Sequence, residues 1–167
     1  ENSSAKLYQM TEDICEKFDL HKYEISNFAK NGHQCCHNLN YWHSGEWIGV
    51  GPGAHSRITK NMKRNAIINE YDPQKWSTMI IKNGNSKIEE EILTNEQNCD
   101  EYLLMSMRTT QGMKIKKYNS LGGKLNKVKI DQFINDGFLE TNSHGENINI
   151  TRKGSMLSDM IIANIAS

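Results

Sequence analysis

The second half of the chain carries start and stop signals that fix the order of its structural elements. Thr94-x-x-Gln97 is a capping box, which opens a helix, and Gly137 stands where a later helix can end. His144-Gly145 is a turn signal between two short strand-like segments, 138–141 and 147–151. The pattern therefore predicts a helix after Thr94, helices near 114–121 and 125–136, a hairpin and a closing helix. This order is typical of a winged-helix-like domain, which we place at residues 88–167.

The first half, residues 1–87, predicts a mixture of helices and short strands. Apolar residues at helical spacing predict a first helix with one apolar face: Leu7, Met10, Ile14 and Phe18. Strands are expected at 23–26, 47–50 and 65–68, and residues 27–46 look irregular. Asp72-Pro73 predicts the start of another helix, with proline at its first position. The fold class expected for the whole chain is α+β.

Composition limits the classes of function. The 167 residues have no net charge and 37% are hydrophobic, so we expect a soluble protein without a general attraction for nucleic acid or anionic lipid. No run of 18 apolar residues could span a membrane. The four cysteines lack C-x-x-C spacing, so they provide no zinc or iron–sulfur site, and free thiols in a reducing cytoplasm are expected. A helical pattern that starts at once after Glu1 suggests a piece of a longer protein.

His37 lies in the densest group of chemically useful side chains, His37-Asn-Leu-Asn-Tyr-Trp42. A neutral imidazole can bind heme iron axially, and Tyr41 and Trp42 can pack against a porphyrin face. The competing interpretation, which composition alone favours, is a histidine hydrogen-bonded inside a loop with the aromatic residues as ordinary core. Three further histidines close in sequence keep the identity of a ligand open: His33, His43 and His55.

Three other patterns suggest chemistry but lack its context. Gly49-Val-Gly-Pro-Gly-Ala54 fits G-x-G-x-x-A, yet no amphipathic helix follows, so we expect a tight turn that lets the backbone approach a ligand rather than a dinucleotide site. A second pattern is a run of lysines: six lysines and no acidic residue lie between residues 112 and 130. Such a run can track phosphates on a winged helix, but it is more often a solvated surface. Cys35 and Cys36 lie near histidines without forming a distinctive hydrolase pattern.

Three motifs in a fixed order resemble the HemW-like family of radical SAM-type heme chaperones, which is similar to oxygen-independent coproporphyrinogen III oxidase. They are Tyr23-Glu-Ile-Ser-Asn-Phe-Ala29, His37-Asn-x-x-Tyr-Trp42 and Gly49-x-Gly-Pro-Gly-Ala-His-Ser56. The resemblance is strong over residues 7–57 and continues more weakly to Gly154. It implies that residues 1–87 are the tail of a partial (β/α) radical SAM barrel with the heme motif, and that 88–167 are the family's C-terminal domain.

The same resemblance implies roles for individual residues. His37, Tyr41 and Trp42 would bind heme, with His37 as a ligand of the heme iron. Ala54 and His55 would approach S-adenosylmethionine. A 4Fe-4S cluster would be held by three cysteines outside this chain, so we expect no radical chemistry from the chain alone.

Two positions depart from the family pattern. Asn31 stands where the family usually has proline, and Cys36 where a basic residue usually precedes the histidine. The second change removes a partner for a heme propionate and offers a thiolate that could touch the iron instead.

The expected function is heme binding and transfer to apo-proteins such as respiratory enzymes. The expected place is the cytoplasm, with membrane association through partners. One alternative is an enzyme, a coproporphyrinogen III oxidase that decarboxylates propionates by radical chemistry. The second is a winged-helix module that binds nucleic acid through its lysine run, which we do not favour. Strands near 23–26 and 47–50 would lack neighbours, so a homodimer through exposed edges is a further expectation.

Overall fold

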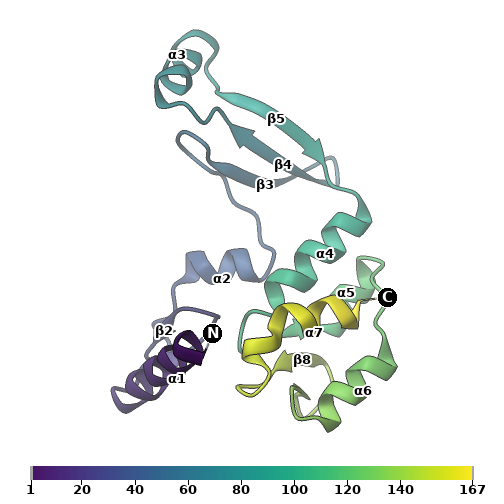
Figure 1. Ribbon diagram of the computed structural model, residues 1–167. Coiled ribbons are helices and arrows are strands. Elements are labelled where there is room, and N and C mark those ends of the chain that lie inside the picture. Colours follow the sequence, from purple (N-terminus) through teal and green to yellow (C-terminus); the bar gives the residue numbers. More distant parts are fainter. Residues whose placement is uncertain (1, 167) are drawn as a thin grey trace.

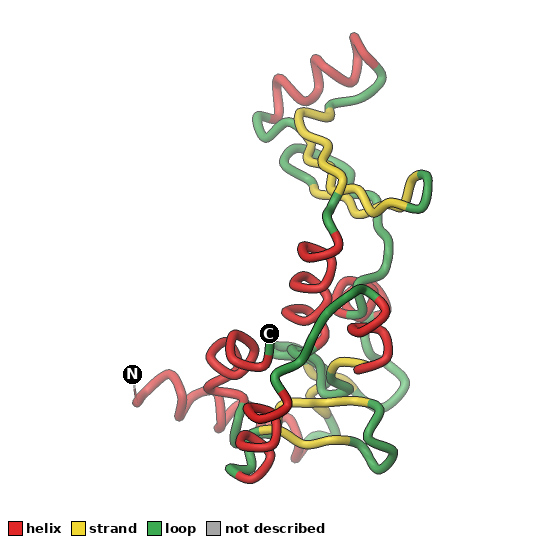
Figure 2. The backbone as a smooth tube through the Cα atoms, turned by 90° about the vertical axis from the view of Figure 1, so that its right-hand side faces the viewer, coloured by secondary structure: helices red, strands yellow, loops and turns green. Residues whose placement is uncertain are grey.

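The computed structural model describes residues 2–166. It combines a body of helices around a small sheet with an arm that projects from it (Figure 1). Turned by 90°, the arm still stands apart from the body, and helix α4 (Asn95–Ser106) leads from one to the other (Figure 2). The expected mixed helix-and-sheet class is confirmed. In the described residues no helix has the length and the apolar character needed to cross a membrane.

The N-terminal segment holds the predicted first helix but not the predicted strand. Helix α1 runs over Asn2–Lys17. Its apolar face is exposed in this chain, at Leu7, Met10 and Ile14, and so is Phe18 in the turn directly after the helix. Strands β1 (His21–Lys22) and β2 (Phe28–Ala29) pair with each other on either side of residues 23–26. The strand expected at 23–26 is therefore wrong. The carboxylate of Glu24 accepts bonds from Ser26 and Asn27, which folds this segment into a turn.

The segment expected to be irregular contains helix α2 (Cys36–Trp42). The strand expected at 47–50 is also wrong, because only Trp47 pairs, in a single bridge with Arg57. Beyond it the chain turns sharply. A Cβ atom at Gly49 would overlap the carbonyl oxygen of His55, so this close approach of the two backbone segments requires glycine at position 49.

The arm is an antiparallel sheet with the strand order β3-β4-β5 and one helix. Its strands are β3 (His55–Lys60), β4 (Lys63–Asn69) and β5 (Lys87–Ile92). Strand β4 contains the strand predicted at 65–68. Helix α3 (Pro73–Asn83) starts as predicted, with the Asp72 carboxylate accepting from the amides of Gln74 and Lys75 at 3.0 and 2.8 Å. Strand β5 spans residue 88, where the sequence places the domain division.

The body follows the predicted order of elements. Both bonds of the capping box of Thr94 and Gln97 are present. After α4 come β6 (Met113–Lys114), α5 (Ile115–Ser120), α6 (Lys127–Asn135), β7 (Leu139–Thr141), β8 (Asn147–Ile150), the 3-10 turn η1 (Ser155–Leu157) and α7 (Ser158–Ile165). The sheet order is β6-β8-β7. The largest fully buried apolar side chains all belong to this part: Met107, Met113, Leu139, Ile148, Ile161 and Ile165.

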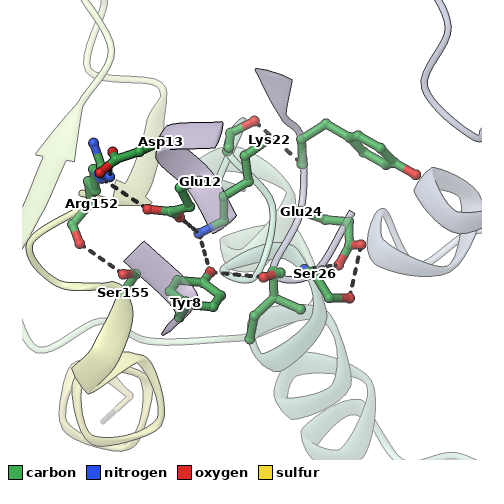
Figure 3. Close-up of polar contacts among 11 residues, drawn as sticks. Tyr8, Glu12, Asp13, Lys22, Glu24, Ser26, Arg152 and Ser155 are labelled. Carbon is green, nitrogen blue, oxygen red and sulfur yellow. Dashed lines mark hydrogen bonds and ion pairs between the residues drawn. The ribbon is translucent and has the colours of Figure 1, made fainter. Parts of the chain in front are cut away.

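Ion pairs join α1 to the body (Figure 3). The nearly buried Glu12 carboxylate accepts from Lys22 Nζ at 2.8 Å and from Arg152 Nε at 2.9 Å. Asp13 forms a second pair with Arg152. Since Arg152 follows β8, these pairs hold the N-terminal helix against the far end of the chain, although its apolar face does not pack there.

Candidate functional site

Helix α2 brings His37 and Tyr41 together at the junction of arm and body (Figure 1). Residues four apart lie on one face of a helix, and here the Tyr41 hydroxyl lies 2.7 Å from His37 Nε2. The two rings meet edge to face with centroids 4.4 Å apart. His37 is exposed and Tyr41 is half-buried. The imidazole is thus accessible to a ligand from solvent and is supported by an aromatic ring on one side.

Trp47 extends this aromatic pair. Its ring packs edge to face on Tyr41, with centroids 4.6 Å apart and planes at 87°. Its indole nitrogen donates to the carbonyl oxygen of His55 at 3.0 Å, and its backbone exchanges two hydrogen bonds with Arg57. Both ends of the tryptophan are therefore fixed, and the line His37–Tyr41–Trp47 forms a continuous contact from α2 to β3.

Two guanidinium groups lie over the Trp47 ring. The central carbons of Arg57 and Arg64 are 5.7 and 5.8 Å from its centroid. Glu101 on α4 accepts from both, from Arg57 Nε at 2.8 Å and from Arg64 Nη2 at 3.1 Å. Arg64 also donates to the carbonyl oxygens of Ser44 and Gly45, directly after α2. This cluster connects the arm, α4 and the end of α2.

The predicted S-adenosylmethionine contacts, Ala54 and His55, lie in the glycine turn and at the start of β3, where Trp47 contacts the backbone of His55. Ala54 is half-buried in the glycine turn, and the side chain of His55 is exposed at the start of β3. The carbonyl oxygens of both residues are already used, by the amide of Asn69 and by Trp47 Nε1. What this turn can still offer a ligand is the His55 imidazole and a close approach to backbone.

The remaining predicted residues are not drawn into the His37 contact. Trp42 is half-buried near the end of α2. Cys35 and Cys36 are exposed at the helix start as free thiols. Among the described residues, no three His, Cys, Asp or Glu side chains are grouped so that they could hold a metal ion.

His43, directly after α2, lies in a cationic setting. Its carbonyl oxygen accepts from Lys117 Nζ at 2.8 Å. Burial, and then the charges of Lys114 and Lys117, lower the pKa of the His43 imidazole below its usual 6.5. The pKa of Lys117 is lowered too, by burial first and then by Arg64 and Lys114. The lowered pKa favours the neutral form of the His43 imidazole.

Lys117 also changes the interpretation of the lysine run. Its ammonium group lies 4.5 Å from the centroid of the Tyr102 ring and is tied to α2, so it serves as an internal connection. Lys129 contacts Gln132 on its own helix. These two lysines therefore have partners within the chain, which fits a structural role better than a row of phosphate contacts.

A cavity of about 300 Å³ lies away from His37, between α1, the end of α4 and the segment that leads into α7. Its wall includes Tyr8, Glu12, Lys22, Arg108 and Arg152. None of the site residues predicted from the sequence lines it. It is enclosed in part by the ion pairs that hold α1 in place (Figure 3).

The sequence reasoning missed Trp47, Arg57, Arg64 and Glu101 as members of the site. Trp47 was assigned to a strand, and the other three lie up to 44 residues from their partners. The one local signal for these residues is Trp47 itself, a third aromatic residue that follows Tyr41 and Trp42 closely in the sequence.

Comparisons with known proteins indicate one kind of relative. No protein-family model matches the chain. It is 33% identical over 153 residues to the mitochondrial radical S-adenosyl methionine domain-containing protein 1 of Dictyostelium discoideum, covering 81% of this chain and 34% of that protein. It is 28% identical over 124 residues to the heme chaperone HemW of Bacillus subtilis, covering 74% of this chain and 32% of that protein.

A solved structure shares the fold. The chain resembles the radical SAM enzyme coproporphyrinogen III oxidase (HemN) of Escherichia coli with a TM-score of 0.66 and 14% sequence identity. The match covers 93% of this chain and 39% of that enzyme. The chain thus spans about a third of the length of the relatives that it matches.

Proposed function

This chain belongs to the family of HemW-like radical SAM proteins, and we propose that it carries the heme-holding segment of a heme-transfer chaperone. The observation that carries the proposal is the exposed His37 imidazole beside Tyr41 and Trp47. An axial ligand next to flat aromatic rings is what a porphyrin with a central iron requires.

The surroundings of His37 support a porphyrin. Ile48 and Val50, which follow Trp47, are 76% and 85% exposed. Large apolar side chains left in water, so soon after Trp47 in the chain, offer a surface for the apolar porphyrin faces. We propose that Tyr41 and Trp42 line the heme site with His37. The bound heme is handed on to apo-proteins such as respiratory enzymes, in the cytoplasm or at a membrane where such partners lie.

In the proposed longer protein, this chain would contact S-adenosylmethionine only through one turn. We propose that Ala54 and the exposed His55 form one edge of the S-adenosylmethionine site. When bound, S-adenosylmethionine and a 4Fe-4S cluster would supply one-electron chemistry. The described residues hold no ligand group for a cluster, so its cysteines would come from outside this chain.

The architecture of the proposed protein follows from the order of elements. We propose that residues 1–87 are the tail of the radical SAM barrel and that 88–167 are a winged-helix-like domain. The order α4-β6-α5-α6-β7-β8, with β6 paired to β8, supports the second assignment. The exposed apolar face of α1 supports the first, since such a face calls for a covering surface. The homodimer was expected through edge strands at 23–26 and 47–50, and neither segment forms that strand. We propose that a homodimer would instead use the arm, where β5 is an edge strand.

A heme titration followed by optical absorption tests the iron ligand. Replacing His37 by alanine removes the imidazole, so we expect a weaker affinity and an altered Soret band. His33→Ala is the matched control, because His33 is exposed and lies four residues away in the sequence. If His37→Ala and the parent protein bind heme with the same affinity and the same Soret band, His37 is not the ligand.

A further inference from the structure

The nitrogen of His37 that faces Tyr41 is not free to bind iron. Tyr41 Oη and His37 Nε2 are 2.7 Å apart, a normal hydrogen-bond distance. If the hydroxyl donates, it occupies the lone pair of Nε2. If Nε2 carries the proton and donates, it has no lone pair to offer. In both tautomers the contact with Tyr41 blocks a metal at this nitrogen.

Nε2 is also the nitrogen that a heme can reach more readily. Nδ1 is bonded to the ring carbon that carries the Cβ atom, so a porphyrin centred on Nδ1 would meet the backbone of α2. Nε2 lies at the far end of the ring, and His37 is exposed. We propose that Tyr41 is a latch on His37, whose hydroxyl competes with the iron for Nε2. This inference rests on the proposed heme binding and concerns its regulation.

The latch is held by the residues behind it. Trp47 packs against the Tyr41 ring, and Trp47 is itself fixed by the carbonyl oxygen of His55 and by the guanidinium groups of Arg57 and Arg64. A tyrosine on a seven-residue helix would otherwise be free to change rotamer. With Trp47 in place, the ring stays where its hydroxyl meets His37.

A competing hydrogen bond suits a protein that must release its heme. Heme iron can bind His37 only after the hydrogen bond between Tyr41 and His37 is broken. The cost of breaking this bond lowers the affinity of His37 for the iron. When iron leaves, the hydroxyl can take its place at Nε2. One net hydrogen bond corresponds to a change in affinity of about twofold to tenfold.

Tyr41→Phe tests the latch, because it removes the hydroxyl and keeps the ring against Trp47. Tyr71→Phe is the matched control, since Tyr71 is an exposed tyrosine on the arm. We expect Tyr41→Phe to bind heme about twofold to tenfold more tightly than the parent. Stopped-flow absorption should show a faster association and an unchanged Soret position. Tyr71→Phe should match the parent.

A ligand-free measurement checks the contact itself. The side-chain nitrogen signals of His37 in a 15N NMR spectrum should move in Tyr41→Phe and stay in place in Tyr71→Phe.

The outcomes separate the latch from the proposed function. Unchanged or weaker heme binding by Tyr41→Phe overturns the latch, provided that His37→Ala alters the Soret band. If His37→Ala leaves heme binding unchanged, the proposed ligand itself fails, whatever Tyr41→Phe does.

Discussion

Glu101 is the one acid that both arginines over Trp47 share, and its replacement by glutamine gives a sharp test of how the arm is attached. The change keeps the shape of the side chain and one acceptor oxygen. It removes the charge and leaves one of the two arginines without its hydrogen bond. The side chains of Glu101, Arg57 and Arg64 are 21%, 19% and 15% exposed, so water can replace the lost partner only in part.

The size of the effect follows from this partial burial. A hydrogen bond to a charged group contributes about 1.5 to 3 kcal/mol, whereas exposed ion pairs contribute about 0 to 1 kcal/mol. We therefore expect Glu101→Gln to lower the free energy of unfolding by about 2 kcal/mol, which corresponds to a fall of about 4 to 8 °C in the melting temperature.

Urea denaturation followed by tryptophan fluorescence measures this change, and Trp47 lies beside the affected groups. Asp159→Asn is the control. Asp159 also pairs with an arginine, Arg108, but it is 82% exposed, so its loss should cost less than about 1 kcal/mol. If Glu101→Gln shifts the midpoint no more than Asp159→Asn, the shared carboxylate does not hold the arm to α4.

Two further predictions concern the body and the end of α2. Gly112 has a φ of +69°, and a Cβ there would overlap the carbonyl oxygen of Ile148, so Gly112→Ala should cost at least about 2 kcal/mol in thermal or urea unfolding. Gly145→Ala, at a φ of +66° with open space, should cost clearly less; equal losses would refute the steric argument. For His43 the folded state has the lower pKa, so the unfolded state binds the proton first, and stability should fall as the pH drops below 6.5. His43→Gln should flatten this part of the curve, and a parallel curve for the variant would contradict the assignment.

The elements of the body could be predicted because the local backbone signals and the buried core residues favour the same helix and strand boundaries. The capping box at Thr94 and Gln97, the turn at Gly145 and the end of α6 before Gly137 each fix a boundary by backbone chemistry. The same segments supply the fully buried apolar residues, so packing reinforces every boundary. Where both agree, the observed elements lie within a few residues of those predicted.

The junction could not be predicted in the same way. The alternation at 23–26 looks like a strand, but Glu24 is fully buried and uses its carboxylate to bend the chain. Helix α2 starts after Cys35 without a side-chain cap and contains no strong helix signal. Helix α2 contacts Trp47 and is connected to Glu101 through the arginines. The contacts of the arginines join residues far apart in the sequence, so no local pattern predicts them. The sequence therefore identified His37 and Tyr41 as candidates, but not that their side chains are bonded to each other.

Helix α2, which carries His37, has a lower local stability than the core of the body. None of the seven described residues of α2 is buried, and a helix of this length is not stable alone. Its C-terminal end is held from outside, by Arg64 at Ser44 and Gly45 and by Lys117 at His43. Of these two side chains, Lys117 also lies against the buried ring of Tyr102, so one of the contacts connects α2 to the core of the body. Segments of low local stability are where proteins exchange ligands, and α2 has the construction of such a segment.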